Sequence, residues 1–223
     1  MSGCSSLTMS VQRTLIFGDI HGCLGILRQM MDRIAFREEK DRLIFVGDYI
    51  DRGEDPYGVV EYLIRLARRS EYVDFLLGNH EAMFMDYLNG TGEDIYMHNG
   101  GMVTIASYRA HMQKHGKPVI PEDHMVFYKQ LKPYIELDDY YVVHAGFRPG
   151  LSIGKQSTED MIWIRDEFVY SDYDFGKRVI FGHTWFRSPF VKKNKIGIDT
   201  GAVYGNQLTC LELPSLRFYH VHA

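Results

Sequence analysis

The chain has 223 residues, of which 45% are hydrophobic, and a formal net charge of −4. This length predicts a single domain over residues 1–223, behind a flexible N-terminus of residues 1–12. The acidic balance argues against a nucleic-acid partner, because no basic excess is available to neutralise many phosphates. The three cysteines lack disulfide spacing and no apolar run is long enough to span a bilayer, so we expect a cytoplasmic protein without a membrane partner.

The first ninety residues alternate two kinds of pattern. Strand-like apolar runs at 14–17, 43–46 and 73–77 alternate with helical periodicity over 24–34, 59–66 and 82–88. This βαβαβ order predicts a parallel sheet with right-handed crossovers. Functional groups in such sheets collect just beyond the carboxyl ends of the strands.

The rest of the chain changes character twice. Residues 89–132 contain turn signals and a short helical candidate at 127–131, so we expect a mostly helical excursion beside the site. Short strands are then predicted at 140–143, 179–181, 190–191, 195–198, 208–211 and 216–221, and their close spacing predicts antiparallel pairing in a second sheet. The expected fold is α/β, a two-sheet mixed β-sandwich flanked by helices.

Three strings that contain metal-ligand side chains follow the first three predicted strands. They are Gly18-Asp19-Ile20-His21-Gly22, Gly47-Asp48-Tyr49-Ile50-Asp51-Arg52-Gly53 and Gly78-Asn79-His80-Glu81. Asp19 and His21 lie two residues apart, so both side chains can point toward one first-row metal. Asp48 has two carboxylate oxygens and can bridge two cations, and Asn79 can add a neutral amide ligand. Taken singly, each string could be a turn with capping residues; together they predict a centre for two metal ions.

The same strings offer groups for phosphate chemistry. Arg52 has a planar fork of donors that matches phosphate oxygens, although a surface pair with Asp51 is the plain alternative. His80 neighbours Asn79 and must point elsewhere, so it is suited to protonating a leaving alkoxide. Its expected carboxylate partner is Asp51. Glu81 could also serve, but the first turn of the following helix favours an acidic residue there.

Two later histidines complete the predicted ligand set. His144 and His183 each end an apolar run beside a glycine. We expect Asp19 and His21 on one metal, Asp48 between the two, and Asn79, His144 and His183 on the other. A second arginine is needed to oppose the charge of a phosphoryl group, and Arg165, which lies between aromatic residues, is the candidate. A helix end is the alternative explanation for Arg165.

At these residues the chain resembles the phosphoprotein phosphatase family of metallophosphoesterases. The three strings, His144-Ala145-Gly146 and Gly182-His183-Thr184 stand in that family's order, over residues 14–211. The segment Trp163-Ile164-Arg165-Asp166-Glu167-Phe168 and residues 198–205 are most similar to the bacterial and phage branch, such as the protein phosphatase of bacteriophage lambda.

The resemblance implies a calcineurin-like sandwich and a serine/threonine protein phosphatase that also accepts phosphotyrosine. It implies two divalent metal ions, Mn²⁺ in assays and Fe or Zn in the cell. A metal-bridging hydroxide would attack the phosphorus in line, without a phosphoenzyme. His80 would be the general acid paired with Asp51, and Arg52 and Arg165 would hold phosphate oxygens of a phosphoprotein or phosphopeptide.

Other functions remain open beside this one. Residues 199–205 replace the serine-alanine-proline-asparagine-tyrosine loop of the eukaryotic enzymes, so their toxin sensitivity is not implied. The same segment is similar to one in symmetrical diadenosine tetraphosphate hydrolases, but those enzymes usually lack an acidic residue before the arginine and end the third string in Asp. Asp51 and Glu81 therefore favour the protein phosphatase. A silent phosphopeptide-binding module would be expected to have lost ligands or the acid, and none is lost here.

Overall fold

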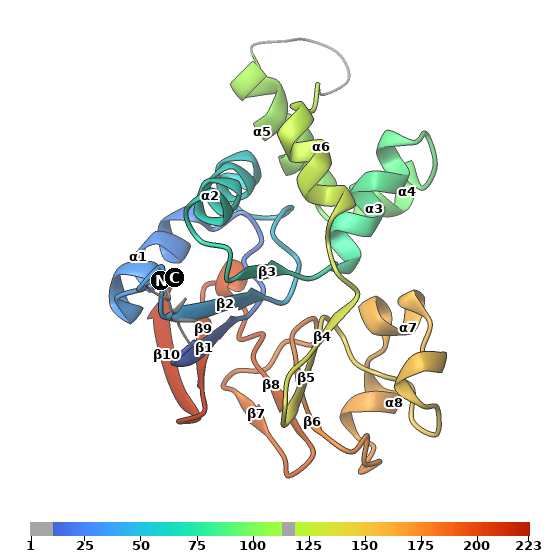
Figure 1. The fold of residues 1–223 in the computed structure, drawn as a ribbon. Coiled ribbons are helices and arrows are strands. Elements are labelled where there is room, and N and C mark those ends of the chain that lie inside the picture. Colours follow the sequence, from blue (N-terminus) through green and yellow to red (C-terminus); the bar gives the residue numbers. More distant parts are fainter. Residues whose placement is uncertain (1–10, 113–118) are drawn as a thin grey trace, which may run out of the picture.

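The computed structural model describes residues 11–112 and 119–223 (Figure 1). The predicted flexible segment, residues 1–12, falls almost wholly outside this range. Within it, two five-stranded sheets lie face to face, and helices cover their outer faces. The predicted sandwich is thus confirmed.

The first sheet has the strand order β10-β9-β1-β2-β3. Its strands are β1 (Arg13–Phe17), β2 (Asp41–Phe45), β3 (Val73–Phe75), β9 (Gln207–Leu213) and β10 (Arg217–His222). As predicted, β1, β2 and β3 are parallel, joined by α1 (Leu24–Ile34) and α2 (Pro56–Arg69). The prediction that the last two strands belong to the second sheet is wrong. The β9–β10 hairpin pairs with β1 instead and covers what would be an open sheet edge.

The second sheet has the order β4-β5-β6-β8-β7. Its strands are β4 (Tyr134–Glu136), β5 (Tyr140–Val143), β6 (Arg178–Phe181), β7 (Phe190–Val191) and β8 (Lys195–Gly197). Antiparallel pairing holds only for β4–β5 and β7–β8, whereas β5, β6 and β8 are parallel. The β5–β6 crossover is long enough for parallel pairing, because it carries η1 (Ile153–Lys155), α7 (Thr158–Trp163) and α8 (Asp166–Val169).

Apolar side chains from both sheets fill the space between them. Ile16, Ile44 and Leu76 of the first sheet meet Val142 and Ile180 of the second, and each is fully buried. Parallel strands buried on both faces need such continuous apolar runs. The carboxyl ends of the parallel strands of both sheets lie on the same side of this shared core. The predicted ligands follow those ends.

The middle of the chain is helical, as predicted. It contains α3 (Asn79–Leu88), α4 (Glu93–His98), α5 (Gly101–Met112) and α6 (Glu122–Lys129). These helices stand together above the first sheet (Figure 1). Helix α3 begins three residues earlier than predicted, so the third string forms the first turn of this helix. One further turn, η2 (Ala202–Tyr204), precedes β9.

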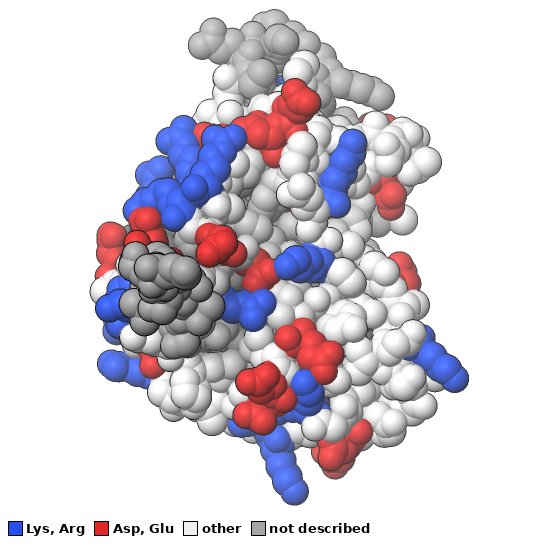
Figure 2. Space-filling model, viewed as in Figure 1, with Lys and Arg blue, Asp and Glu red and all other residues white. Residues whose placement is uncertain are grey.

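Basic side chains gather over α2 (Figure 2). Arg65, Arg68 and Arg69 of this helix are paired with Glu61, Asp123 and Glu38, respectively. The cluster is thus matched by carboxylates, as the negative net charge suggests. In the part of the chain that the structure describes, no helix has both the length and the apolar character needed to cross a bilayer.

Candidate metal centre

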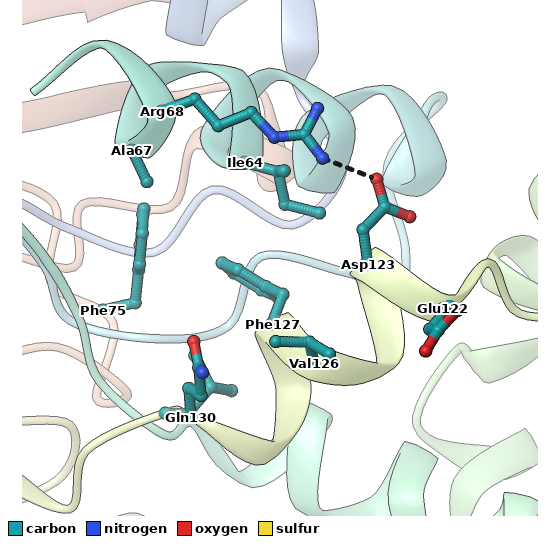
Figure 3. A pocket seen from close by; sticks show the side chains of 10 residues that line it. Ile64, Ala67, Arg68, Phe75, Glu122, Asp123, Val126, Phe127 and Gln130 are labelled. Atoms are coloured by element: carbon teal, nitrogen blue, oxygen red, sulfur yellow. Dashed lines mark hydrogen bonds and ion pairs between the residues drawn. The ribbon is translucent and has the colours of Figure 1, made fainter.

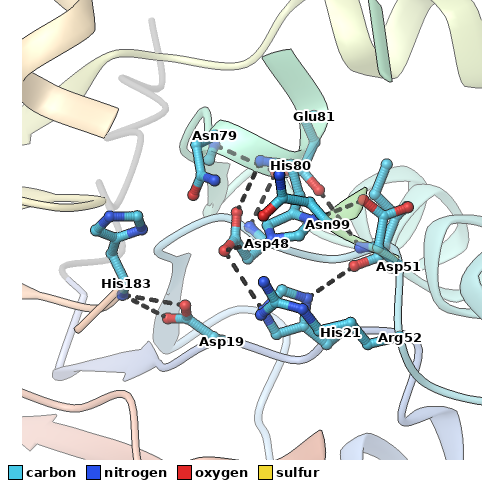
Figure 4. Close-up of polar contacts among 12 residues, drawn as sticks. Asp19, His21, Asp48, Asp51, Arg52, Asn79, His80, Glu81, Asn99 and His183 are labelled. Atoms are coloured by element: carbon cyan, nitrogen blue, oxygen red, sulfur yellow. Dashed lines mark hydrogen bonds and ion pairs between the residues drawn. The ribbon is translucent and has the colours of Figure 1, made fainter. Parts of the chain in front are cut away.

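The predicted ligands converge where the two sheets' strand ends meet. Figure 4 shows Asp19, His21, Asp48, Asn79 and His183 turned toward a common space. The predicted ligands are all buried, although they come from five separate loops or helix starts. Burying this many polar groups is costly unless they have partners, so their convergence marks a functional site.

The backbone of these loops is strained. Seven non-glycine residues have positive φ among those described, and five are predicted site residues: His21, Asp48, Asp51, Arg52 and His183. A non-glycine residue in this region costs on the order of 1–3 kcal/mol and persists only where its surroundings enforce it. The strained backbone is therefore concentrated in the loops that orient the predicted site side chains.

Two of the predicted histidine ligands are held in the tautomer that metal binding needs. His21 Nδ1 lies 2.9 Å from the Ile50 carbonyl oxygen, and His144 Nδ1 lies 3.0 Å from that of Val46. A carbonyl only accepts, so both Nδ1 atoms carry the proton and both Nε2 atoms keep a lone pair. His183 Nε2 is buried without a hydrogen-bond partner. These nitrogens fit metal ions, which would also supply the partner that His183 Nε2 lacks.

Asp48 lies between the histidines. Its Oδ2 is 3.5 Å from His21 Nε2, and its Oδ1 is 3.4 Å from His144 Nε2. Two clusters with metal-ligand spacing share this carboxylate: His21, Asp48 and His80, and Asp48, His144 and His183, with ligand atoms within 4.8 Å of one another in each. The geometry thus fits the predicted bridging position, and Asn79 Oδ1 lies 3.1 Å from His144 Nε2 on the predicted second-metal side.

The first cluster differs from the predicted grouping in two respects. It contains His80, whose Nε2 is 3.9 Å from Asp48 Oδ2, and it lacks Asp19. The Asp19 carboxylate instead accepts the backbone N–H of His183, at 3.0 and 3.2 Å. Asp19 therefore ties the loops of the two sheets together across the centre, a contact that strand-end spacing alone does not reveal.

The electrostatics of the centre favour cations. Burial raises the pKa of Asp19 and of Asp48, and nearby carboxylates raise each further, those of Asp199 and Glu81 respectively. Burial also lowers the pKa of His21, which keeps the imidazole neutral and able to bind metal. Several carboxyl groups thus share a buried space with neutral histidines, and bound divalent ions would offset their repulsion.

His80 and Asp51 are in direct contact, as the predicted pairing requires. His80 Nδ1 lies 2.6 Å from Asp51 Oδ2, with both residues buried. The other oxygen, Oδ1, accepts hydrogen bonds from Tyr96 Oη at 2.8 Å and Thr104 Oγ1 at 2.5 Å. Burial raises the pKa of Asp51 to about 7, although these two hydrogen bonds act in the opposite direction. Tyr96 and Thr104 come from α4 and α5, so the helical excursion fixes the carboxylate that orients His80.

Glu81 has a structural role. Its carboxylate accepts the backbone N–H groups of Asp48 at 2.9 Å and Tyr49 at 2.8 Å, which fixes the loop that presents the central carboxylate. It also accepts the N–H of Gly78 at 3.2 Å. The first-turn position was predicted, but the bonds across to the second string were not, because they depend on how the first turn of α3 lies against the loop that follows β2.

The two predicted arginines lie on opposite sides of the centre. Arg52 Nη1 donates to His21 Nε2 at 3.0 Å, and Arg165 Nη1 donates to the carbonyl oxygen of His183 at 3.1 Å. Arg165 is exposed, and Arg52 is half-buried. An anion above the ligands would meet a guanidinium from either side.

Asn99 lies near the second string, and no sequence signal pointed to it. Figure 4 includes its side chain in the close-up of the centre, and its Nδ2 donates to the Ile95 carbonyl oxygen at 2.8 Å. The following Gly100, at φ +96°, lies against Arg52, where a Cβ would come within 2.9 Å of Arg52 Cγ. In the sequence, residues 99–101 read only as a turn, because their proximity to the second string requires the α4–α5 fold.

A cavity of about 620 Å³ lies elsewhere, between α2 and α6 (Figure 3). Ile64, Phe75 and Phe127 line it, and the ion pair of Arg68 with Asp123 borders it. It contains none of the predicted site residues, so its size does not make it the active site.

The profile of the calcineurin-like phosphoesterase family matches residues 12–196. The chain belongs to this family. Membership confirms the predicted fold class and establishes a metallophosphoesterase with a His/Asp cluster able to bind metals.

Named relatives extend over nearly the whole chain. It is 27% identical to the bis(5′-nucleosyl)-tetraphosphatase PrpE (asymmetrical) of Bacillus cereus strain AH820, with 91% of each chain covered. The protein of the same name from Bacillus thuringiensis strain Al Hakam is equally similar, at 27% identity and the same coverage.

Solved structures share the fold. A protein described as a candidate diadenosine tetraphosphatase superposes with a TM-score of 0.74 at 24% identity, with 96% of this chain and 97% of that chain covered. The cold-active protein-tyrosine phosphatase of a psychrophilic Shewanella species gives 0.69 at 15% identity, with 95% and 78% covered. The same architecture therefore occurs in proteins with differently named substrates.

Proposed function

We propose that the protein is a metal-dependent phosphoprotein phosphatase that hydrolyses phosphate monoesters directly. The observation that carries this proposal is the buried pair of His80 and Asp51, 2.6 Å apart beside the ligand cluster. A serine or threonine alkoxide is a poor leaving group and needs a proton as the ester bond breaks. A phosphate anhydride leaves as a weakly basic phosphate and needs that proton much less.

The roles follow from the positions of the side chains. Arg52 and Arg165 hold the phosphate oxygens, and His80 Nε2 presents a proton to the leaving oxygen. Burial and the two arginines lower the pKa of His80, so a phosphate dianion between the arginines would offset their charge and favour the protonated ring. Asp51 keeps Nδ1 protonated and the ring in place.

The metal ions would be held by Asp48 with His21, Asn79, His144 and His183, and Asp19 adds a carboxylate beside them. When bound, such ions supply Lewis acidity toward phosphate oxygens and lower the pKa of water. We propose two divalent ions, with Mn²⁺ for assays and Fe or Zn as alternatives. Metal analysis of the purified protein tests both the number and the identity.

The test is His80→Asn with substrates of different leaving groups. On a phosphothreonine peptide the turnover should fall by about 10²–10⁴-fold, the usual contribution of proton donation. On p-nitrophenyl phosphate, whose leaving group needs no proton, the fall should be smaller. His98→Asn is the matched control. Equal turnover of the variant and the wild type on the peptide would refute the assignment.

A second candidate function is hydrolysis of dinucleoside tetraphosphates, and the names of the relatives favour it. Asp51 and Glu81 speak against a symmetrical hydrolase, whereas these relatives are named asymmetrical. Rates on diadenosine tetraphosphate and on a phosphothreonine peptide, with the same Mn²⁺, compare the two functions. Unequal nucleotide products and a much larger rate constant for the dinucleotide would replace the first proposal by the second.

A further inference from the structure

Two exposed aromatic rings stand beside the candidate metal centre. Trp185 and Tyr204 keep 49% and 60% of their surface exposed, and their ring centroids lie 6.5 Å apart at an angle of 79°. Trp185 follows the predicted ligand His183 by two residues, and Tyr204 ends η2. Large aromatic rings contribute little to stability in such positions, and exposed aromatic clusters mark binding sites.

Tyr204 contacts a residue of the centre, and Trp185 packs against Gly201, which directly precedes η2. The Arg52 guanidinium carbon lies 5.7 Å from the centroid of the Tyr204 ring, within the range of a cation–π contact. The indole Nε1 of Trp185 lies against Gly201, where an added Cβ would overlap it, and Gly201 has φ +70°. Glycine there provides both the left-handed backbone and the space for the indole. The platform, defined as Trp185 and Tyr204, is thus contiguous with a phosphate-binding arginine.

We propose that this platform binds the nucleobase of a nucleoside polyphosphate whose phosphate chain reaches Arg52 and the metal centre. This inference deepens the second candidate function and rests on it. A base has a flat π-face on each side, and it can stack on one ring while its edge meets the other. The guanidinium between platform and ligands would contact the negatively charged phosphate chain.

A nucleobase and a tyrosyl ring differ in how far each lies from the phosphorus of its substrate. In an aryl phosphate the ring is attached directly to the ester oxygen, so it must lie over the ligands and His80. In a nucleotide the ribose separates the base from the phosphorus. Arg52 contacts His21 through Nη1 at 3.0 Å and the Tyr204 ring at 5.7 Å, so it links the ligands to the platform, and this arrangement suits the longer connection.

Kinetics of the Mn²⁺-loaded full chain test the proposal. Trp185→Ala and Tyr204→Ala should each raise KM for diadenosine tetraphosphate about 10-fold, in the range expected for one base–aromatic stack, with kcat little changed. Neither should change KM for a phosphothreonine peptide without aromatic residues. Tyr204→Phe and Trp185→Phe keep a ring and should stay near wild type. Tyr170→Ala, at an exposed ring outside the platform, is the matched control.

Three outcomes would overturn the proposal. The alanine variants could leave KM for the dinucleotide unchanged. They could raise KM for the phosphothreonine peptide equally, which would make the rings supports for Arg52. They could affect a phosphotyrosine peptide more than the dinucleotide, which would assign the platform to a tyrosyl ring.

A binding measurement separates this proposal from the proposed functions. Only Trp163 and Trp185 are tryptophans in the chain. In a Trp163→Phe variant, AMP stacked on Trp185 should quench its fluorescence saturably, whether or not any substrate is hydrolysed, and Tyr204→Ala should weaken that binding. Absence of hydrolysis with saturable quenching would refute the enzyme functions alone. Absence of quenching with hydrolysis intact would refute the platform alone.

Discussion

The two ends of strands β1 and β2 each contain a buried aspartate, but the charges around the two aspartates differ. At the amino ends, Asp41 is fully buried and pairs with Arg13 at 2.9 Å and Arg37 at 2.6 Å, while Arg13 also pairs with Glu212 at 2.9 Å. At the carboxyl ends, Asp48 is equally buried, but its nearest ionisable neighbours are histidines and carboxylates.

The pKa values of the two aspartates record this difference. Burial acts to raise the pKa of Asp41, but hydrogen bonds from Arg13 and Arg37 outweigh it and lower the value to about 2. Burial raises the pKa of Asp48, and Glu81 raises it further. At the amino ends, arginines pair with the buried carboxylate and stabilise the fold. At the carboxyl ends, the buried carboxylate of Asp48 is paired with histidines, and a metal ion can supply the positive charge.

The largest expected effect is the loss of activity in Asp48→Asn. Removing the carboxylate shared by both clusters should lower kcat/KM on the order of 10³-fold, because metal ions contribute several kcal/mol of transition-state stabilisation. The free energy of unfolding in the presence of a chelator should be unchanged or higher, since a buried charge is removed. Kinetics with Mn²⁺ and urea denaturation with EDTA measure the two quantities. Strong destabilisation without metal would show that Asp48 is structural.

Asp41→Asn should produce the opposite result. It leaves Arg13 and Arg37 without their buried partner, so the free energy of unfolding should fall by about 3 kcal/mol. The kcat of the folded protein should not change. Urea denaturation and steady-state kinetics test this pair of expectations, with the exposed Asp86→Asn as the control, expected within about 0.5 kcal/mol of wild type. A stable but inactive Asp41→Asn protein would contradict the division between the two ends.

Metal ions should stabilise the folded protein only by binding at the carboxyl ends of the strands. Mn²⁺ at about 100 times its dissociation constant should raise the free energy of unfolding by about 2.7 kcal/mol in the wild type. Asp41→Asn should gain the same amount from a lower starting value, and Asp48→Asn should gain little. Denaturation curves with and without Mn²⁺ provide the comparison, and an undiminished gain in Asp48→Asn would place the metal elsewhere.

The pH dependence of stability should separate the two ends as well. The pKa of Asp41 is depressed to about 2 in the folded state, against 3.8 for the unfolded group. Its contribution to stability is therefore complete above pH 3.8 and is lost as the pH falls toward 2. The difference in unfolding free energy between wild type and Asp41→Asn should shrink by about 2 kcal/mol over this window. A constant difference would show that Asp41 stabilises by packing alone.

The smallest expected effect concerns the support of the acid pair. Thr104→Val removes the hydrogen bond to Asp51 Oδ1 and also the acceptor of the Asp51 backbone N–H. It should lower turnover of a phosphothreonine peptide about 10-fold, the equivalent of about 1.4 kcal/mol. Thr104→Ser keeps the hydroxyl and should remain close to wild type. Single-turnover assays at saturating Mn²⁺ measure the difference, and equal rates in both variants would show that Tyr96 alone suffices.

Local sequence determined most of the candidate centre. Strand-like runs followed at once by Asp19, Asp48 and Asn79 already place polar ligands at one edge of a parallel sheet, because carboxyl ends of parallel strands lie together. The isolated histidines His144 and His183 were found by the same signal. The crossovers over α1 and α2 follow from helical periodicity, and the βαβαβ order fixes their hand.

Only the tertiary structure decided which groups meet across distant segments. The β9–β10 hairpin joined the first sheet because an open edge of β1 was available, which strand patterns cannot show. Tyr96, Thr104 and Asn99 reach the centre because α4 and α5 pack over the second string. Side chains such as these carry no motif of their own, since any helix can present a tyrosine or threonine. Which residues could bind metal was thus local information, whereas what orients His80 and what lies beside Arg52 depended on how the helices and sheets pack.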